Sequence, residues 1–143
     1  MKMNKEQIKT VIPHREPMLL IDEVLEMVEG ERIKTTLYLD PELDFFRGHF
    51  PGEPVMPGVL TVESMAQTAD VLLLSMPAYK GKVPLFIGID KVSFKKKINP
   101  GDTITIEASI EKENKEKAVV TCSAVVYNHG EVSTTGLVTL AMR

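Results

Sequence analysis

Three polar side chains share one side of the most apolar stretch of the chain. Glu63, Gln67 and Asp70 follow one another at intervals of four and three residues, which places them on a single stripe of a helix. A carboxyl group half-buried among apolar neighbours resists ionisation and suits a general acid. Gln67, one turn beyond Glu63, can hold the orientation of that carboxyl group. The alternative is that the stripe is only the exposed face of an amphipathic helix.

A histidine lies upstream of this stretch, in the segment Arg47-Gly48-His49-Phe50-Pro51-Gly52. Histidine titrates near neutral pH and can take up or release a proton. The prolines and glycines around it restrict the backbone, and proton transfer needs such fixed placement. His49 is therefore a candidate general base, although a single loop histidine more often has no catalytic role.

The tripeptide Met56-Pro57-Gly58 directly precedes the predicted helix. Proline is favoured in the first helical turn, and glycine lets a ligand or another backbone approach closely. The first N–H groups of a helix are unpaired and lie at the positive end of its dipole. They could stabilise an oxyanion formed from a substrate carbonyl, whereas the plainer interpretation is an ordinary helix start.

Composition narrows the class of protein. A chain of 143 residues has the length of one domain, so we predict a single domain over residues 1–143. The 17 Lys and Arg against 20 Asp and Glu give a net charge of −3, which argues against a nucleic-acid partner. One cysteine, Cys122, cannot form an intramolecular disulfide or a Cys-rich zinc site. With no cluster of metal ligands in the sequence, we expect neither a metal nor a cofactor.

The apolar segments of the chain predict neither a signal peptide nor a membrane span. Residues 1–15 lack the apolar core of a signal peptide. The apolar stretch from Val59 to Met76 contains Glu63 and Asp70, and an ionised group at the centre of a bilayer costs about 2.5–3.5 kcal/mol. We therefore expect a soluble, cytoplasmic protein with no membrane partner.

Hydrophobic periodicity predicts the elements that must position these residues. Apolar residues point in nearly every direction over residues 59–76, which is typical of a helix buried on all sides. Residues 40–58 follow no period and predict a long functional loop. The other elements are a short helix at 5–11, strands at 18–28 and 32–39, and later strands at 83–98, 103–110, 118–127 and 131–142, with a charged connection at 111–117. This order predicts an α+β domain in which an antiparallel sheet packs on one helix.

The segment His49 to Leu60, followed by Glu63-Ser64-Met65-Ala66-Gln67, resembles the signature of the beta-hydroxyacyl-acyl carrier protein dehydratases of type II fatty acid synthesis, the FabZ type. Further matches lie at residues 12–15, 17–22, 88–91, 94 and 100–102. Glutamate at position 63 resembles the dehydratase branch, because the dehydratase/isomerase branch has aspartate there. The resemblance covers most of the chain and implies the hot-dog fold, a long central helix wrapped by an antiparallel β-sheet.

The resemblance also implies a reaction, the reversible loss of water from an (R)-3-hydroxyacyl thioester to give the trans-2-enoyl thioester. His49 would remove the α proton, and Glu63 would protonate or orient the departing oxygen. The Gly58 N–H would polarise the thioester carbonyl, and Gln67 would position Glu63. Three neighbouring residues complete the expected substrate site: Phe50, Pro57 and Val59.

The implied partners are a second copy of the chain and an acyl carrier protein. The family forms homodimers whose sheets join edge to edge, often three dimers to a hexamer, with His49 of one subunit facing Glu63 of the other. Acyl carrier protein is strongly acidic, so an enzyme of net charge −3 should present a local basic patch. The candidates are Lys91, Lys95 and Lys97, which we expect on one face of the predicted strand 83–98, joined by Lys96 and Arg15. Alternatively, these lysines only keep a strand edge soluble.

Two other functions remain open at this point. A non-catalytic acyl-thioester-binding hot-dog protein needs no acid–base pair, so the presence of both His49 and Glu63 argues against it. A hydratase or thioesterase acting on acyl coenzyme A would differ chiefly in the carrier of the acyl chain. A comparison of the two carriers with one acyl chain separates these possibilities.

Overall fold

A computed structural model describes all 143 residues. It confirms the predicted order of one short helix, two strands, a long helix and four strands. It adds one helical turn in the predicted loop. In chain order the elements are α1 (Lys5–Lys9), β1 (Glu23–Val28), β2 (Arg32–Tyr38), α2 (Phe45–Gly48), α3 (Gly58–Leu74), β3 (Pro84–Phe94), β4 (Thr103–Asn114), β5 (Val119–Asn128) and β6 (Glu131–Met142).

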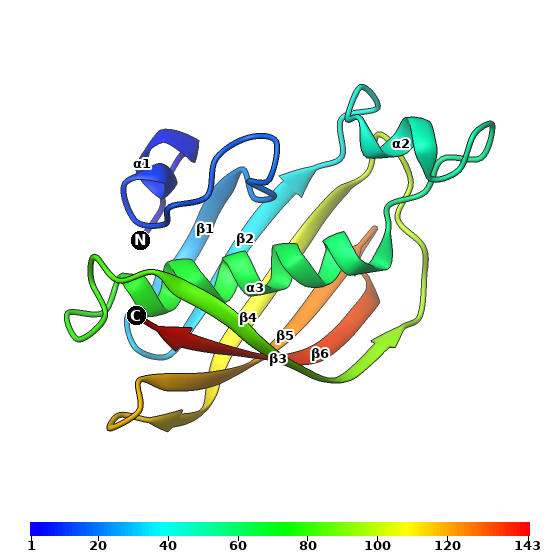
Figure 1. Cartoon of the computed structure of the whole chain (residues 1–143). Coiled ribbons are helices and arrows are strands. Elements are labelled where there is room, and N and C mark those ends of the chain that lie inside the picture. Colours follow the sequence, from blue (N-terminus) through cyan, green and yellow to red (C-terminus); the bar gives the residue numbers. More distant parts are fainter.

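The six strands form one antiparallel sheet in the order β1-β2-β4-β5-β6-β3. Figure 1 shows the curved sheet wrapped around α3, which lies across its inner face. The predicted α+β hot-dog architecture is therefore confirmed. β1 and β3 are the two edge strands, and β3 reaches its edge because the chain crosses from α3 to the far side of β6.

Helix α3 forms the centre of the core, as predicted. Thirteen of its 17 residues are buried. At about 1.5 Å per residue it spans roughly 25 Å, enough to cross the whole sheet. Strands β4 and β5 supply alternating inward residues against it: Ile104, Ile106, Ala108, Val120, Cys122, Ala124 and Val126. Because the helix is covered over most of its circumference, every polar group on it must find a partner inside the protein.

Some element boundaries differ from the prediction. The helix ends at Leu74, where the Ser75 hydroxyl donates to the Val71 carbonyl oxygen at 2.6 Å, and Pro77 prevents its continuation. β4 continues to Asn114 through residues predicted as a connection, because exposed charged residues there still pair with β5 across a bulge. The single turn α2 is too short to show a helical period. None of these helices is both long and apolar enough to cross a membrane.

Candidate active site

The polar stripe of α3 is buried. The Gln67 side chain is fully buried, Asp70 is 2% exposed and the Glu63 side chain is 16% exposed. The interpretation of the stripe as the solvent-exposed face of an amphipathic helix is therefore wrong. Three polar groups held inside an apolar core must instead satisfy one another or serve a ligand.

The Gln67 carboxamide fixes one oxygen of Glu63. Its Nε2 donates to Glu63 Oε2 at 2.8 Å and to the Met18 carbonyl oxygen at 2.8 Å, while its Oε1 accepts the Leu20 N–H at 2.7 Å. The loop before β1 thus orients the amide, and the amide orients the carboxyl group. Glu63 Oε1 makes no hydrogen bond in the chain and is not among the fully enclosed polar atoms. This oxygen is free to meet a substrate.

His14 approaches the same carboxyl group from the loop after α1. Its Nε2 lies 3.8 Å from Glu63 Oε2 and 3.7 Å from Asp70 Oδ2. Sequence reasoning assigned His14 no role. Its only signal was its place in the Ile12-Pro13-His14-Arg15 match, which says nothing of what the ring contacts. The chain holds no group of three or more His, Cys, Asp or Glu side chains arranged to bind a metal ion.

The environment changes the proton affinities around Glu63. Burial lowers the pKa of His14, which favours the neutral imidazole, although the charge of Glu63 opposes this shift. Burial also raises the pKa of Asp70 well above its ordinary value, and the nearby Glu63 adds to that shift. Burial, with Asp70 close by, raises the pKa of the Cys122 thiol to about 12. Asp70 therefore keeps its proton at pH values where an exposed aspartate has lost it.

Asp70→Asn is expected to stabilise the fold, increasingly as the pH rises. The folded state raises the pKa of Asp70, so the native contribution of this group is complete below its ordinary value of 3.8 and is lost as the pH rises towards the folded pKa. An amide of the same shape avoids this loss. Thermal melts of both proteins should give nearly equal Tm values at the acid end and a higher Tm for the variant near pH 8. A difference that is constant across the pH range contradicts the assignment.

His49 lies in the loop between α2 and α3, where hydrogen bonds join His49 to Val55. The Val55 N–H donates to the His49 carbonyl oxygen at 2.8 Å, and His49 Nδ1 lies 3.0 Å from the Val55 carbonyl oxygen. A carbonyl oxygen only accepts, so Nδ1 carries the hydrogen and Nε2 presents a lone pair, as a general base requires. The exposed Phe50 ring stacks on the imidazole at 4.0 Å between centroids. Within one chain, His49 and Glu63 make no polar contact.

The start of α3 opens into a groove of about 550 Å³. Pro57 is buried at the N-cap, and its carbonyl oxygen accepts the N–H groups of Leu60 and Thr61. The N–H groups of Gly58 and Val59 have no acceptor within the chain.

A Cβ at Gly58 would lie 2.9 Å from ring carbons of Phe94, so the glycine allows this aromatic ring to pack on the first turn of the helix. Val59 is 77% exposed beside it.

Three of the predicted docking lysines line the same groove: Lys95, Lys96 and Lys97. The prediction that the lysines share one strand face is wrong, because β3 ends at Phe94 and its register shifts between Asp90 and Ser93. Lys91 has a positive φ of 52° in this irregular stretch and does not line the groove. Arg15 does not line the groove either, and its guanidinium donates to the carbonyl oxygens of Lys9, Ile12 and His14. Neither His49 nor Glu63 lines the groove.

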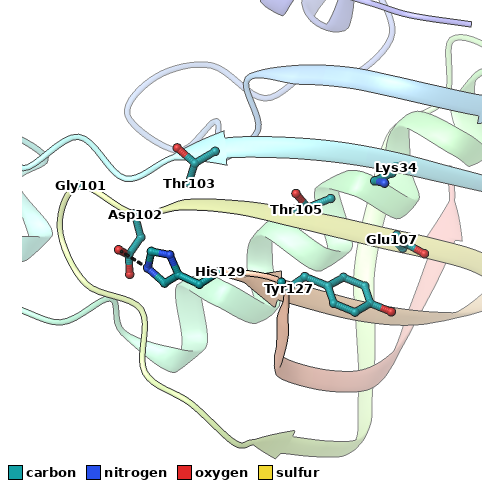
Figure 2. A pocket seen from close by; sticks show the side chains of 9 residues that line it. Lys34, Gly101, Asp102, Thr103, Thr105, Glu107, Tyr127 and His129 are labelled. Atoms are coloured by element: carbon teal, nitrogen blue, oxygen red, sulfur yellow. Dashed lines mark hydrogen bonds and ion pairs between the residues drawn. The ribbon is translucent and has the colours of Figure 1, made fainter.

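A second hollow, of about 640 Å³, lies on the outer face of the sheet and contains none of the predicted site residues. Figure 2 shows the His129 ring turned towards the Asp102 carboxylate, with Lys34 and Glu107 further along the strands. His129 Nε2 and Asp102 Oδ1 are 3.1 Å apart, and Asp102 Oδ2 accepts from Asn99 N–H and Asn128 Nδ2. These contacts tie the turn before β4 to the turn after β5.

Comparisons with known proteins identify relatives of this chain. Residues 12–136 match the model of the FabA-like domain family. The chain is 49% identical over 110 residues to the 3-hydroxyacyl-[acyl-carrier-protein] dehydratase FabZ of Oenococcus oeni, covering 77% of this chain and 79% of that protein. It is 46% identical over 139 residues to FabZ of Streptococcus pneumoniae, covering 96% of each. Among solved structures, the dehydratase heterocomplex ApeI:P of Xenorhabdus doucetiae matches with a TM-score of 0.80 at 17% identity, over 95% of this chain and 90% of that one.

The solved structure shares the fold. Together with the six-stranded sheet around α3, it defines the class of a hot-dog protein. The curated relatives identify the family within this class, because their sequence identity to this chain extends over most of both sequences. The chain belongs to the FabZ family of 3-hydroxyacyl-[acyl-carrier-protein] dehydratases within the FabA-like domain family.

Proposed function

We propose that His49 and Glu63 catalyse the dehydration of (R)-3-hydroxyacyl-acyl carrier protein to the trans-2-enoyl product. The overall reaction rests on one observation, the 46% identity to FabZ over 96% of both chains. The protein is a 3-hydroxyacyl-acyl carrier protein dehydratase, a hydro-lyase of fatty acid biosynthesis. The roles of individual residues rest on the hydrogen bonds and burial described above.

The proposed step needs a base and an acid on opposite ends of one carbon–carbon bond. The free lone pair of His49 Nε2 takes the α proton, and the electron pair of that C–H bond forms the new double bond. The β-carbon–oxygen bond breaks, and the proton of Glu63 joins the departing hydroxyl to give water. The unpaired Gly58 N–H stabilises the negative charge that develops on the thioester oxygen. Phe50, Pro57 and Val59 border the path of the acyl chain.

We place the two catalytic groups of each site on different subunits of a homodimer. Within one chain the His49 imidazole and the Glu63 carboxyl make no polar contact. Edge strand β3 also carries large exposed apolar side chains, at Leu85, Ile87 and Ile89. A long apolar strand edge promotes uncontrolled pairing unless a partner covers it. Pairing β3 with β3 of a second copy covers this edge and joins the two sheets.

Mixing His49→Ala subunits with Glu63→Gln subunits should restore activity that neither variant has alone. A hybrid dimer with shared sites contains one site with both native groups, so random exchange gives about half of the dimers one working site. The assay is turnover before and after subunit exchange, with exchange followed by two distinguishable tags. Complete exchange without recovery of turnover contradicts the shared site.

The test of function is an assay of enoyl thioester absorbance with one 3-hydroxyacyl chain on two carriers. We expect rapid formation of the enoyl product from acyl carrier protein and slower formation from coenzyme A. Faster turnover of the coenzyme A substrate assigns the chain to hydration of acyl coenzyme A, and release of free thiol assigns it to thioester hydrolysis. No turnover of either substrate, with tight binding of both, identifies a non-catalytic binding protein.

The lysines at the groove provide a second measurement in the same assay. Lys95→Glu combined with Lys97→Glu should raise KM for the acyl carrier protein substrate by about tenfold, because electrostatic steering changes association rates by roughly 10–10³-fold. KM for a small thioester should not change. Lys91→Glu is the matched control, since it makes the same charge change outside the groove. An equal rise in KM for Lys91→Glu would show that the groove is not the docking surface.

A further inference from the structure

His14 is a titratable group near Glu63 to which the proposed mechanism gives no task. The ring belongs to the loop after α1, and its side chain is 18% exposed. Its Nε2 faces two carboxyl oxygens of α3 at 3.8 Å and 3.7 Å, on Glu63 and Asp70. Its Nδ1 is enclosed and has no hydrogen-bond partner.

These contacts determine which nitrogen carries the hydrogen. Burial lowers the pKa of His14, so the ring is neutral and has a single N–H. A hydrogen on Nδ1 would leave a buried donor without an acceptor, and the Nε2 lone pair would then face Glu63 Oε2, an oxygen that already accepts from Gln67. A hydrogen on Nε2 leaves Nδ1 as an unpaired acceptor but points the one N–H at the Glu63 oxygen, which can accept it. The N–H of His14 is therefore directed at the carboxyl groups.

We propose that His14 is a positioning residue for the dehydration, whose Nε2–H, together with the Gln67 amide, holds Glu63 Oε2 and stabilises the carboxylate left when Glu63 gives up its proton. This inference rests on the proposed role of Glu63 as the acid. Gln67 already donates to Oε2 at 2.8 Å, and His14 adds a second donor on the same oxygen. The other oxygen, Oε1, is left free for the substrate.

The separation of 3.8 Å is longer than a hydrogen bond. Contacts of catalytic groups are often long in the resting enzyme and shorten when the substrate is bound. In the proposed step Glu63 gives up a proton, so an N–H aimed at Oε2 stabilises the transition state more than the complex in which Glu63 still holds that proton. The loss of His14 should therefore change kcat rather than KM.

The experiment measures steady-state kinetics of His14→Leu and His14→Gln with the acyl carrier protein substrate. His14→Leu removes the N–H while keeping an apolar side chain of similar reach, and its kcat should fall by about 10–100-fold, as expected when a reacting group is misplaced by about 1 Å. KM should stay within about threefold. His14→Gln places an N–H near the position of Nε2 and should recover most of kcat. His129→Leu is the matched control, because this histidine lies on the outer face of the sheet, and its kcat should equal that of the native chain.

Several results would overturn the inference. These are a native kcat for His14→Leu, equal losses in His14→Leu and His14→Gln, or a loss confined to KM. Thermal melts accompany each variant, and His14→Met replaces His14→Leu if the latter does not fold. In a Glu63→Gln background, His14→Leu should cost no further kcat, since no carboxylate is left to stabilise. If Glu63→Gln alone keeps the native kcat, the acid assignment fails. If Glu63→Gln is inactive and His14→Leu is fully active, only the role of His14 fails.

Discussion

His49→Ala is expected to reduce kcat/KM by about 10²–10⁴-fold, the range that general acid–base catalysis contributes. The fold should be retained, because the imidazole lies in a loop, where it hydrogen-bonds the Val55 carbonyl oxygen and stacks on the Phe50 ring, and is not part of the hydrophobic core. Alanine removes the Nε2 lone pair and leaves no other imidazole in that loop. The measurement is formation of the enoyl thioester by the purified variant, together with its thermal melt and circular dichroism spectrum.

Two further variants make this result specific to the base. His49→Gln keeps a polar side chain that can still donate to Val55 but cannot take up a proton, so it should be nearly as inactive as alanine. His129→Ala removes the exposed histidine on the outer face of the sheet and should be fully active. A His49→Ala protein with turnover near that of the native chain removes His49 from the mechanism.

The fold was predictable because its main elements have strong periodic signals. The stretch around α3 is apolar in nearly every direction, which predicts a helix buried on all sides, and Glu63 and Asp70 within it favour a protein core over a membrane. Burial alternates along the whole of β5 and from Thr134 to Leu140 in β6, so the inward faces of these segments could be predicted from residue type. By contrast, the outer half of β4 is charged on both faces. It pairs with β5 through backbone hydrogen bonds, which the residue types do not predict.

The candidate site was predictable where it depends on spacing along one element. Glu63 and Gln67 are one helical turn apart, so their hydrogen bond follows from helix geometry alone. His14 is 49 positions from Glu63, and only the folded loop after α1 brings its ring to the same carboxyl group. The shared strand face predicted for Lys91, Lys95 and Lys97 was wrong for a related reason, since a bulge in β3 and the end of the strand at Phe94 change which way successive side chains point.

Glu63→Gln is expected to lower kcat by about 10²–10⁴-fold while KM and the dimer are preserved. The Gln67 Nε2 now donates to Glu63 Oε2, and it can donate equally to the oxygen of the introduced amide. The side chain thus keeps its place, its length and its ability to hydrogen-bond the substrate hydroxyl. It loses only the proton that must follow the departing oxygen. A loss confined to kcat is the signature of an interaction made chiefly in the transition state.

The stability of this variant separates the acid role from a structural one. The Glu63 side chain is 16% exposed and packs beside the buried Gln67, and an amide is less costly to desolvate than a carboxylate. The Tm of Glu63→Gln should therefore equal or exceed that of the native chain. Glu63→Asp is the informative partner, because it keeps a transferable proton but shortens the side chain by one carbon, so it should retain more kcat than Glu63→Gln. A large rise in KM with kcat unchanged in Glu63→Gln would show that Glu63 binds the substrate and does not protonate the leaving group.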